Sequence, residues 1–489
     1  MAEKSKAIKA IEVTDISVAR ALADGFKLVA DQQGQGAVAN SIIHVLSGIG
    51  QPEVLKGLKE DIRKPELPLR VRGAYFKSLD SDSSEDMAKF FQELADDSAA
   101  TLRMLAITAL GKRGYEPAFD TVAQRMNDGS WRVKLAAANA LADYGIRDAE
   151  KFRDRALALL ISALQTERGR MLEDVSSALK KLTGENYGVD PHAWHDWHKR
   201  TKGGTVEPRD PAKGTRPRAY YGNDTYSTQV IYVIDMSVSM LDPVDPELAK
   251  KIITGAHKDK DKKDDPSKPK EPGQDDNREP IDWSKITCKL DLAKAELKRT
   301  LKSLPEDVWF TIVAYSTKVE KWKEEIVPAT EANKKAAIAY IDTLKCTELT
   351  NIFGALDEAI GMCEKNYDDA AAAKAKKGAK QITGAKEERV ADTIWFLTDG
   401  FATTGKYKGP DMQGEGTKED AEAYNLEMKE MLSEIRQRNE IARVTIHAIG
   451  IGNREVDTWT LKRLAQENNG IFVQVGDGKK PEEKRGGKK

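Results

Sequence analysis

Residues 230–240 have the sequence VIYVIDMSVSM, and this stretch decides how the second half of the chain is interpreted. An apolar run rich in β-branched residues ends at Asp235, and Ser237 and Ser239 follow it at alternate positions. The run predicts a buried strand, so the three polar side chains are expected together at its end. One carboxylate and two hydroxyls are hard oxygen donors, which favour Mg2+, Mn2+ or Ca2+ over zinc or copper.

Two later segments have the same layout. Residues 393–400, TIWFLTDG, bring a second apolar run to Asp399, and Thr350 stands just ahead of a helical pattern in LTNIFGAL. Strand-like and helix-like segments alternate between residues 225 and 476, which predicts an α/β, doubly wound (Rossmann-like) sheet of mainly parallel strands. Such sheets bind ligands at the carboxyl ends of their strands, where Asp235 and Asp399 are expected. The expected strands are residues 229–235, 308–316, 393–400, 442–452 and 470–476.

Five of these polar residues occur in a characteristic order along the chain: Asp235, Ser237, Ser239, Thr350 and Asp399. They resemble the metal-ion-dependent adhesion site of a von Willebrand factor A domain. The resemblance implies that the two serines and Thr350 bind the cation directly, while Asp235 and Asp399 act partly through water. It also implies Mg2+ as the expected ion, with Mn2+ and Ca2+ as alternatives, and a carboxylate from a partner protein at an open position on the ion.

One position departs from that resemblance. Relatives usually carry Gly between the two serines, whereas this chain has Val238, a β-branched residue that restricts the turn. The alternative hypothesis is therefore a site that has kept its ligand residues and no longer binds a metal.

The first 185 residues have a different pattern, rich in Ala and Leu with helical periodicity. Five segments open with an apolar residue and end with Leu eight positions later: VANSIIHVL, VRGAYFKSL, LRMLAITAL, VKLAAANAL and MLEDVSSAL. Their final leucines are 33, 31, 31 and 38 residues apart, a period typical of a solenoid of helix pairs. The pattern resembles HEAT repeats, which implies an extended protein-binding surface.

Basic residues recur near the start of the second helix of successive pairs: Arg70, Arg72, Arg103, Arg132 and Lys134. We interpret them as interhelical and solvent-facing polar positions of the repeat rather than as a track for nucleic acid. The repeats end in PHAWHDWHKR, whose Trp pair is expected to pack on the last repeat. A zinc site at His192, His195 and His198 is the alternative, although one helix rarely supplies a complete tetrahedral site.

These patterns predict the domain boundaries. We expect a HEAT-like helical repeat domain at 1–200, a linker at 201–224, a von Willebrand A domain at 225–476 and a disordered tail at 477–489. A disordered insertion is expected at about 255–280, where Lys, Asp and Pro replace core residues. The junction resembles that of bacterial proteins that join HEAT repeats to a von Willebrand A domain.

The composition limits which partners and which cellular location we expect. The 489 residues carry a formal net charge of −1 and three cysteines without metal-type spacing, Cys288, Cys346 and Cys363. This balance gives no general argument for nucleic acid or an anionic membrane as the partner. No apolar run approaches the ~20 residues of a membrane span, and the N-terminus lacks the apolar core of a secretory signal. We expect a cytoplasmic protein, with export as the alternative if a signal has been removed.

The sequence does not predict an enzyme. It contains no glycine-rich phosphate loop, nucleophile elbow or HExxH motif, and a metal held by hydroxyls lacks an obvious general base. We expect a scaffold or adhesion protein whose cation captures an acidic group of a partner, with the repeats as a second interaction surface. The alternatives are an RNA-binding ribonucleoprotein scaffold resembling the Ro autoantigen, and a von Willebrand A partner of an AAA+ ATPase.

Overall fold

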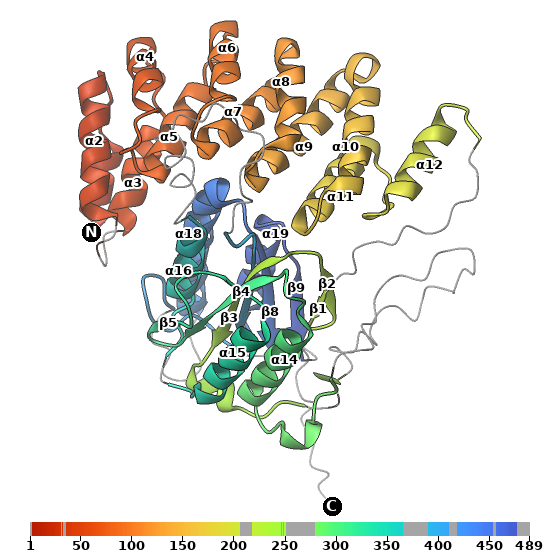
Figure 1. The fold of residues 1–489 in the computed structure, drawn as a ribbon. Helices are drawn as coiled ribbons and strands as arrows, with labels where there is room; N and C mark the ends of the chain where they lie inside the picture. The colour runs from red at the N-terminus through yellow and green to blue at the C-terminus, as the bar shows by residue number, and fades with distance from the viewer. Residues whose placement is uncertain are drawn as a thin grey trace, which may run out of the picture. The chain divides into compact units, whose positions relative to one another are not determined.

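The computed structural model describes residues 2–30, 32, 36–205, 218–245, 247, 249–250, 279–347, 349–364, 390–409, 418–452 and 456–476. Along the sequence, two compact units divide between Thr215 and Arg216. The first unit is helical and the second contains a sheet covered by helices (Figure 1). The insertion predicted at about 255–280 lies outside the described residues up to residue 278, and the predicted tail at 477–489 lies wholly outside them.

The helical unit is built from helix pairs. The first helices of the pairs are α2 (Ile16–Val29), α4 (Pro52–Asp61), α6 (Glu85–Leu94), α8 (Phe119–Gln124) and α10 (Asp154–Thr166). The second helices are α3 (Gly36–Leu46), α5 (Leu69–Asp80), α7 (Ala100–Arg113), α9 (Trp131–Arg147) and α11 (Arg170–Thr183). A short helix α1 (Ala2–Lys9) precedes them and α12 (Pro191–Thr201) follows. Each of the five segments with a final leucine lies inside one second helix.

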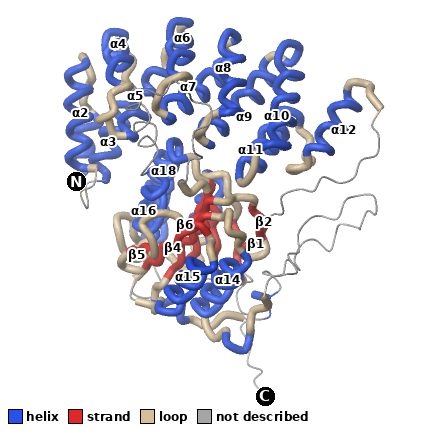
Figure 2. Tube along the Cα trace, in the orientation of Figure 1, coloured by secondary structure: helices blue, strands red, loops and turns tan. Residues whose placement is uncertain are grey.

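The core of the helical unit follows the sequence period. The second helices contact one another in succession and lie side by side in one layer (Figure 2). The leucines that close the five segments are all fully buried: Leu46, Leu79, Leu110, Leu141 and Leu179 are 0% exposed. Each repeat therefore buries its apolar stripe against its neighbours, which is how a solenoid obtains a continuous core.

The sheet unit has a mainly parallel sheet with strand order β5-β4-β3-β7-β8-β9, and β6 pairs with β4. The parallel strands are β3 (Gln229–Asp235), β4 (Trp309–Tyr315), β7 (Thr393–Thr398), β8 (Thr445–Ile451) and β9 (Phe472–Val475). Two short strands, β5 (Val319–Lys321) and β6 (Val327–Pro328), run antiparallel to β4. Along the chain, β4 is added on one side of β3, and β7 is then added on the other side of β3. The strand order therefore reverses beside β3, where doubly wound sheets bind ligands.

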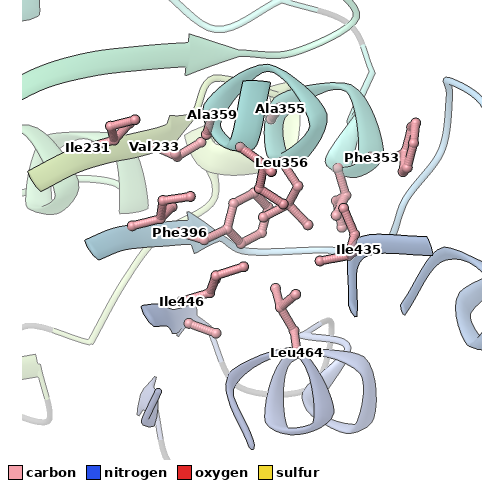
Figure 3. Close-up of a cluster of buried hydrophobic side chains, with 14 of the residues drawn as sticks. Ile231, Val233, Phe353, Ala355, Leu356, Ala359, Phe396, Ile435, Ile446 and Leu464 are labelled. Atoms are coloured by element: carbon pink, nitrogen blue, oxygen red, sulfur yellow. The ribbon is translucent and has the colours of Figure 1, made fainter. Parts of the chain in front are cut away.

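Helices cover both faces of this sheet. On one face, α16 (Ile352–Glu364), α18 (Lys418–Ala442) and α19 (Thr458–Glu467) pack on Ile231, Val233 and Phe396 (Figure 3). On the other face lie α14 (Lys289–Ser303) and α15 (Glu331–Thr343), against Tyr232 and Ile234. All seven residues of β3 are buried, which is why its sequence is continuously apolar instead of alternating.

The linker predicted at 201–224 extends too far toward the C-terminus, because residues from 218 onward already belong to the sheet unit. The structure has a β-hairpin there, formed by β1 (Arg218–Tyr220) and β2 (Asn223–Thr225), which belongs to the sheet unit. Its two turn residues, Tyr221 and Gly222, both have positive φ (48° and 72°), as a two-residue type I′ hairpin loop requires. Tyr221 is 0% exposed and its backbone N–H donates to Glu296 of α14, so burial of the tyrosines holds the hairpin in the core.

The Trp- and His-containing segment forms α12, as expected for a capping helix. Asp190 caps it by accepting from the N–H of His192, and Trp194 is 0% exposed with its indole N–H donating to the carbonyl of Gly188 (2.8 Å). The tryptophan pair packs edge to face with ring centroids 5.9 Å apart. These contacts pack the two tryptophan rings of this helix against each other.

Candidate metal centre

Asp235 is the last residue of β3 and is fully buried. One carboxylate oxygen accepts the Ser237 backbone N–H (2.7 Å), and the other accepts the hydroxyls of Thr398 (2.6 Å) and Tyr315 (3.2 Å). Burial, and after it the nearby charge of Asp399, raises the pKa of Asp235 to about 6. Three hydrogen bonds therefore fix the position of this buried carboxylate.

A chain of oxygen atoms joins Ser237, Ser239 and Asp399. The two serine hydroxyls lie 3.0 Å apart, and the Ser239 hydroxyl donates to Asp399 Oδ1 at 2.8 Å. Asp399 follows β7 directly, and β7 pairs with β3, so strand order brings together residues that are 160 positions apart. The predicted convergence of these side chains at one sheet edge is found in the structure.

Thr350 lies on a third loop, between α15 and α16, which is tied to the other two. Thr347 of this loop bridges to Ser237, and its N–H donates to the Met236 carbonyl at 2.8 Å. On the other side, the Thr350 N–H donates to the Thr403 hydroxyl at 2.9 Å, in the loop that follows Asp399. Thr350 is 4% exposed and is held between the loops that carry the other four predicted residues.

Oxygen spacing provides a test of whether these residues suit a divalent cation. An octahedral ion with Mg–O distances of about 2.1 Å has neighbouring ligand oxygens about 3.0 Å apart. The separations of 3.0 Å and 2.8 Å along Ser237, Ser239 and Asp399 match that spacing. Two carboxylates and neutral hydroxyls also form the hard-oxygen set that such ions prefer. The residues present fit a divalent cation.

Val238 does not strain this loop. It begins a short 3-10 turn, Val238–Leu241, and its side chain is 49% exposed. In the described part of the chain the non-glycine residues with positive φ are Tyr221, Arg443 and Asn469. Val238 therefore has ordinary backbone geometry, and the position does not need the conformational freedom of Gly.

Lys289 also belongs to this site, although it was not predicted. It is the first residue of α14, and its ammonium donates to Asp399 Oδ2 (2.8 Å) and Asp242 Oδ2 (3.2 Å) while its side chain is 5% exposed. Burial alone would lower the pKa of Lys289, but the hydrogen bonds and charges of the two aspartates outweigh it and raise that pKa. Its neighbours in KLDLAK follow an ordinary amphipathic helix pattern, so the local sequence did not mark it.

The described residues contain no group of three or more His, Cys, Asp or Glu side chains that could hold a metal ion, and the centre formed by Asp235 and Asp399 has only two such side chains beside its hydroxyls. His192, His195 and His198 therefore do not form such a group. His198 lies instead 3.5 Å from Asp154 of α10. Within the same described residues, no helix has the length and apolar character that crossing a bilayer requires.

Three of the five basic residues that recur in the repeats are buried in the helical unit. Arg72, Arg103 and Arg132 are 3%, 6% and 0% exposed. Arg103 makes a bidentate ion pair with Asp128, with N–O distances of 2.8 and 2.9 Å. The guanidinium of Arg132 stacks over the ring of Trp131. These three side chains hold helices together and do not present charge to a phosphate backbone.

Comparison with known families finds matches in both units. The family profile described as von Willebrand factor type A domain matches residues 11–129 and 281–473, more than half of the chain. The chain belongs to this family. The second matched segment includes Thr350 and Asp399, whereas the loop from Asp235 to Ser239 lies outside it. HEAT repeats match residues 87–182, which fall in the helical unit. We refer to residues 218–476 below as the A domain.

Individual relatives are distant. Inter-alpha-trypsin inhibitor heavy chain H3 from Mus musculus is 29% identical over 188 residues, which is 38% of this chain and 17% of that protein. The Homo sapiens protein of the same name is 27% identical over 133 residues, 27% of this chain and 13% of its own length. The chain thus spans less than a fifth of the length of these curated relatives. A solved structure, von Willebrand factor type A from Catenulispora acidiphila, matches with a TM-score of 0.28 and 15% identity over 52% of this chain and 40% of that one.

Proposed function

We propose that the A domain binds a divalent cation, Mg2+ in the first instance, and uses it to capture a carboxylate of a protein partner. Ser237, Ser239 and Thr350 would supply direct ligands, with Asp235 and Asp399 orienting them or acting through water. Hydroxyl ligands are neutral and leave the ion electrophilic, so an acidic partner group completes its shell. The protein acts by recognition and not by catalysis, and the helical repeats offer a second interaction surface.

The observation that carries this proposal is the chain of oxygens Ser237–Ser239–Asp399, whose spacing suits neighbouring positions on an octahedral ion. The position of the site supports the same function, because Asp235 ends β3 and Asp399 directly follows the adjacent strand β7, where the strand order reverses. A general base poised for hydrolysis is not part of this constellation, since Asp235 is bonded to Thr398, Tyr315 and Ser237.

The alternative function in RNA binding receives no support from the repeats. Of the five residues that would form a basic track, Arg72, Arg103 and Arg132 are buried. The other two are engaged within the repeats, because Arg70 donates to Asn40 and Lys134 donates to Glu167. Filter binding of structured RNA at two salt concentrations tests this point, and tight, salt-dependent retention would reverse our preference.

Calorimetry tests the cation site. We expect Mg2+ and Mn2+ to give a saturable binding heat with the wild-type protein, and Asp235→Ala to lose it, because that carboxylate orients the serine loop. Asp392→Asn is the matched control, since Asp392 is also a buried aspartate beside β7 but lies at the opposite end of that strand, bonded to Ser227. Circular dichroism of all three proteins checks that the variants are folded.

Two results contradict the proposal. The first is the absence of any heat with the wild-type protein, and the second is equal Mg2+ affinity in the wild type and Asp235→Ala. A pull-down with and without EDTA then separates the two surfaces. Partners lost both in EDTA and with Asp399→Ala are bridged by the metal, and partners retained in both belong to the repeats.

A further inference from the structure

Large apolar side chains are unusually exposed on the loops of the proposed cation site. In the described part of the A domain, the exposed large apolar residues are Val238, Leu241, Leu349, Phe401, Leu426, Trp459 and Ile471. Four of these seven lie within two positions of a proposed ligand residue. Their exposed fractions are 49% for Val238, 56% for Leu241, 42% for Leu349 and 37% for Phe401. We call these four residues the apolar collar.

The apolar collar is drawn from three loops that the structure ties together at one edge of the sheet. The loop of Val238 and Leu241 is joined to the loop of Phe401 by the hydrogen bond from Ser239 to Asp399. It is joined to the loop of Leu349 by the bridge from Ser237 to Thr347. Exposed apolar residues that are far apart in the sequence therefore lie on the same three connected loops as the proposed ligand residues.

Each of these loops is held in place by its own contacts. Met240, between the two exposed residues of the first loop, is 0% exposed and anchors it in the core. The Leu349 N–H donates to the Thr317 hydroxyl at 3.3 Å, and the Phe401 ring packs edge to face on Tyr424 at 5.2 Å. The collar side chains are thus presented to solvent on fixed backbone, which lowers the entropy cost of binding.

We infer that the apolar collar docks a segment of a protein partner in which one Asp or Glu has large apolar residues on either side. This inference rests on the proposed function, because the cation supplies the positive charge that selects the central carboxylate. Clustered exposed apolar surface marks an interaction site, and apolar contacts around an ion pair exclude water and strengthen it. An acidic segment with polar neighbours would bind the cation but would leave the apolar collar exposed to water. The cation and the collar together therefore favour a segment that combines a carboxylate with apolar neighbours.

The collar also gives a role to the exposed side chain of Val238. Its backbone geometry is ordinary and its side chain points into solvent, so the folded domain gains little from it. A valine at this position instead adds apolar surface directly between the two serine ligands.

Short fluorescein-labelled peptides test the inference by fluorescence polarisation with the full-length protein in saturating Mg2+. One peptide has Asp between Leu and Phe, a second has Asp between two serines, and a third has Asn between Leu and Phe. We expect the first to bind at least about tenfold more tightly than the second, since its apolar side chains bury collar surface. The third peptide, and all peptides in EDTA, should not bind.

Variants assign the gain to the collar. Leu349→Ser and Phe401→Ser should each weaken binding of the first peptide several-fold, and the double variant should weaken it by about tenfold or more. Binding of the second peptide should not change. Leu426→Ser is the control, because Leu426 is 60% exposed and lies on helix α18 instead of on one of the three site loops. The calorimetric Mg2+ affinity of all three variants should equal that of the wild type.

Several outcomes overturn the inference. Equal binding of the first two peptides, or equal losses for Leu426→Ser and Leu349→Ser, removes the role of the collar while leaving the cation site intact. Reduced Mg2+ affinity in Leu349→Ser shows that the collar supports the ion and not a partner. Mg2+-dependent dimerisation lost in Phe401→Ser assigns the face to a second copy, and binding of phosphatidylserine vesicles in place of the peptides assigns it to a lipid. Absence of Mg2+ binding by the wild type refutes the proposed function itself.

Discussion

Lys289 gives the proposed cation site a positive charge of its own. Its ammonium lies 2.8 Å from Asp399 Oδ2, and both side chains are almost wholly buried. The lysine offsets one of the two carboxylates when no metal is bound, which limits repulsion between Asp235 and Asp399. The same charge opposes a divalent cation at the neighbouring Asp399 oxygen. We therefore expect Lys289 to limit how tightly the proposed site binds a cation.

Replacing this lysine should separate its two effects. We expect Lys289→Met to bind Mg2+ at least about tenfold more tightly, because a like charge is removed beside the ion. In EDTA the same variant should lose about 2–4 kcal/mol of unfolding free energy, because Asp399 is left buried without its partner. Titration calorimetry and urea denaturation measure the two quantities.

Lys294→Met is the matched control for that change. Lys294 lies on the same helix, but its ammonium donates to the Leu344 carbonyl (2.6 Å) and not to a residue of the site. Its replacement should leave Mg2+ affinity unchanged. Equal Mg2+ affinity in Lys289→Met and the wild type would show that the ammonium does not influence the ion.

At the scale of elements, close approach of helices decides the geometry of the repeats. Gly111 of α7 faces Ala140 of α9 so closely that an added Cβ would lie 2.5 Å from the Ala140 Cβ and 2.6 Å from its Cα. Those atoms belong to the backbone and first side-chain carbon of a packed helix, so they cannot move aside independently. The two helices can approach this closely only because both positions are small.

Gly111→Ala should therefore destabilise the protein, although alanine is the better helix former by about 1 kcal/mol. We expect a loss of about 1–3 kcal/mol from overpacking, measured by urea denaturation followed by circular dichroism. Gly361→Ala in α16 is the control, because the nearest atom to its added Cβ is the end of the Arg438 side chain at 3.6 Å. Stabilisation of both variants alike would refute the packing argument.

For the whole molecule, the two units have separate cores, so a cation should stabilise only one of them. At a free Mg2+ concentration about 100 times Kd, binding adds about 2.7 kcal/mol to the stability of the A domain. We expect hydrogen exchange in the full-length protein to slow at β3, β7 and the loops that follow them, and to stay unchanged in helices α5 to α11. Asp235→Ala should show no response to Mg2+. Equal protection of the repeats would show that the cation acts on both units.

The periods of the sequence determined most of the fold. Continuous apolar runs predicted the strands that end at Asp235 and Asp399, because strands buried on both faces need apolar residues at every position. The spacing of Leu79, Leu110 and Leu141 predicted the repeats, because each repeat must bury the same stripe. The hairpin at 218–225 was missed, since its stability comes from burial of Tyr221 beside α14 and not from a strand pattern of its own.

The sequence by itself thus determined which residues form strands and repeats, and which oxygen donors end the strands, because local periodicity reflects which faces are buried. Only the tertiary structure decided which of these ends meet. Pairing of β7 with β3 places Asp399 beside Ser239, and packing of α14 brings Lys289 to the same carboxylate. The tertiary structure also buries Arg103 and Arg132 and brings together the three loops that carry the apolar collar. These contacts join residues distant along the chain, so they depend on strand order and packing and leave no local pattern to detect.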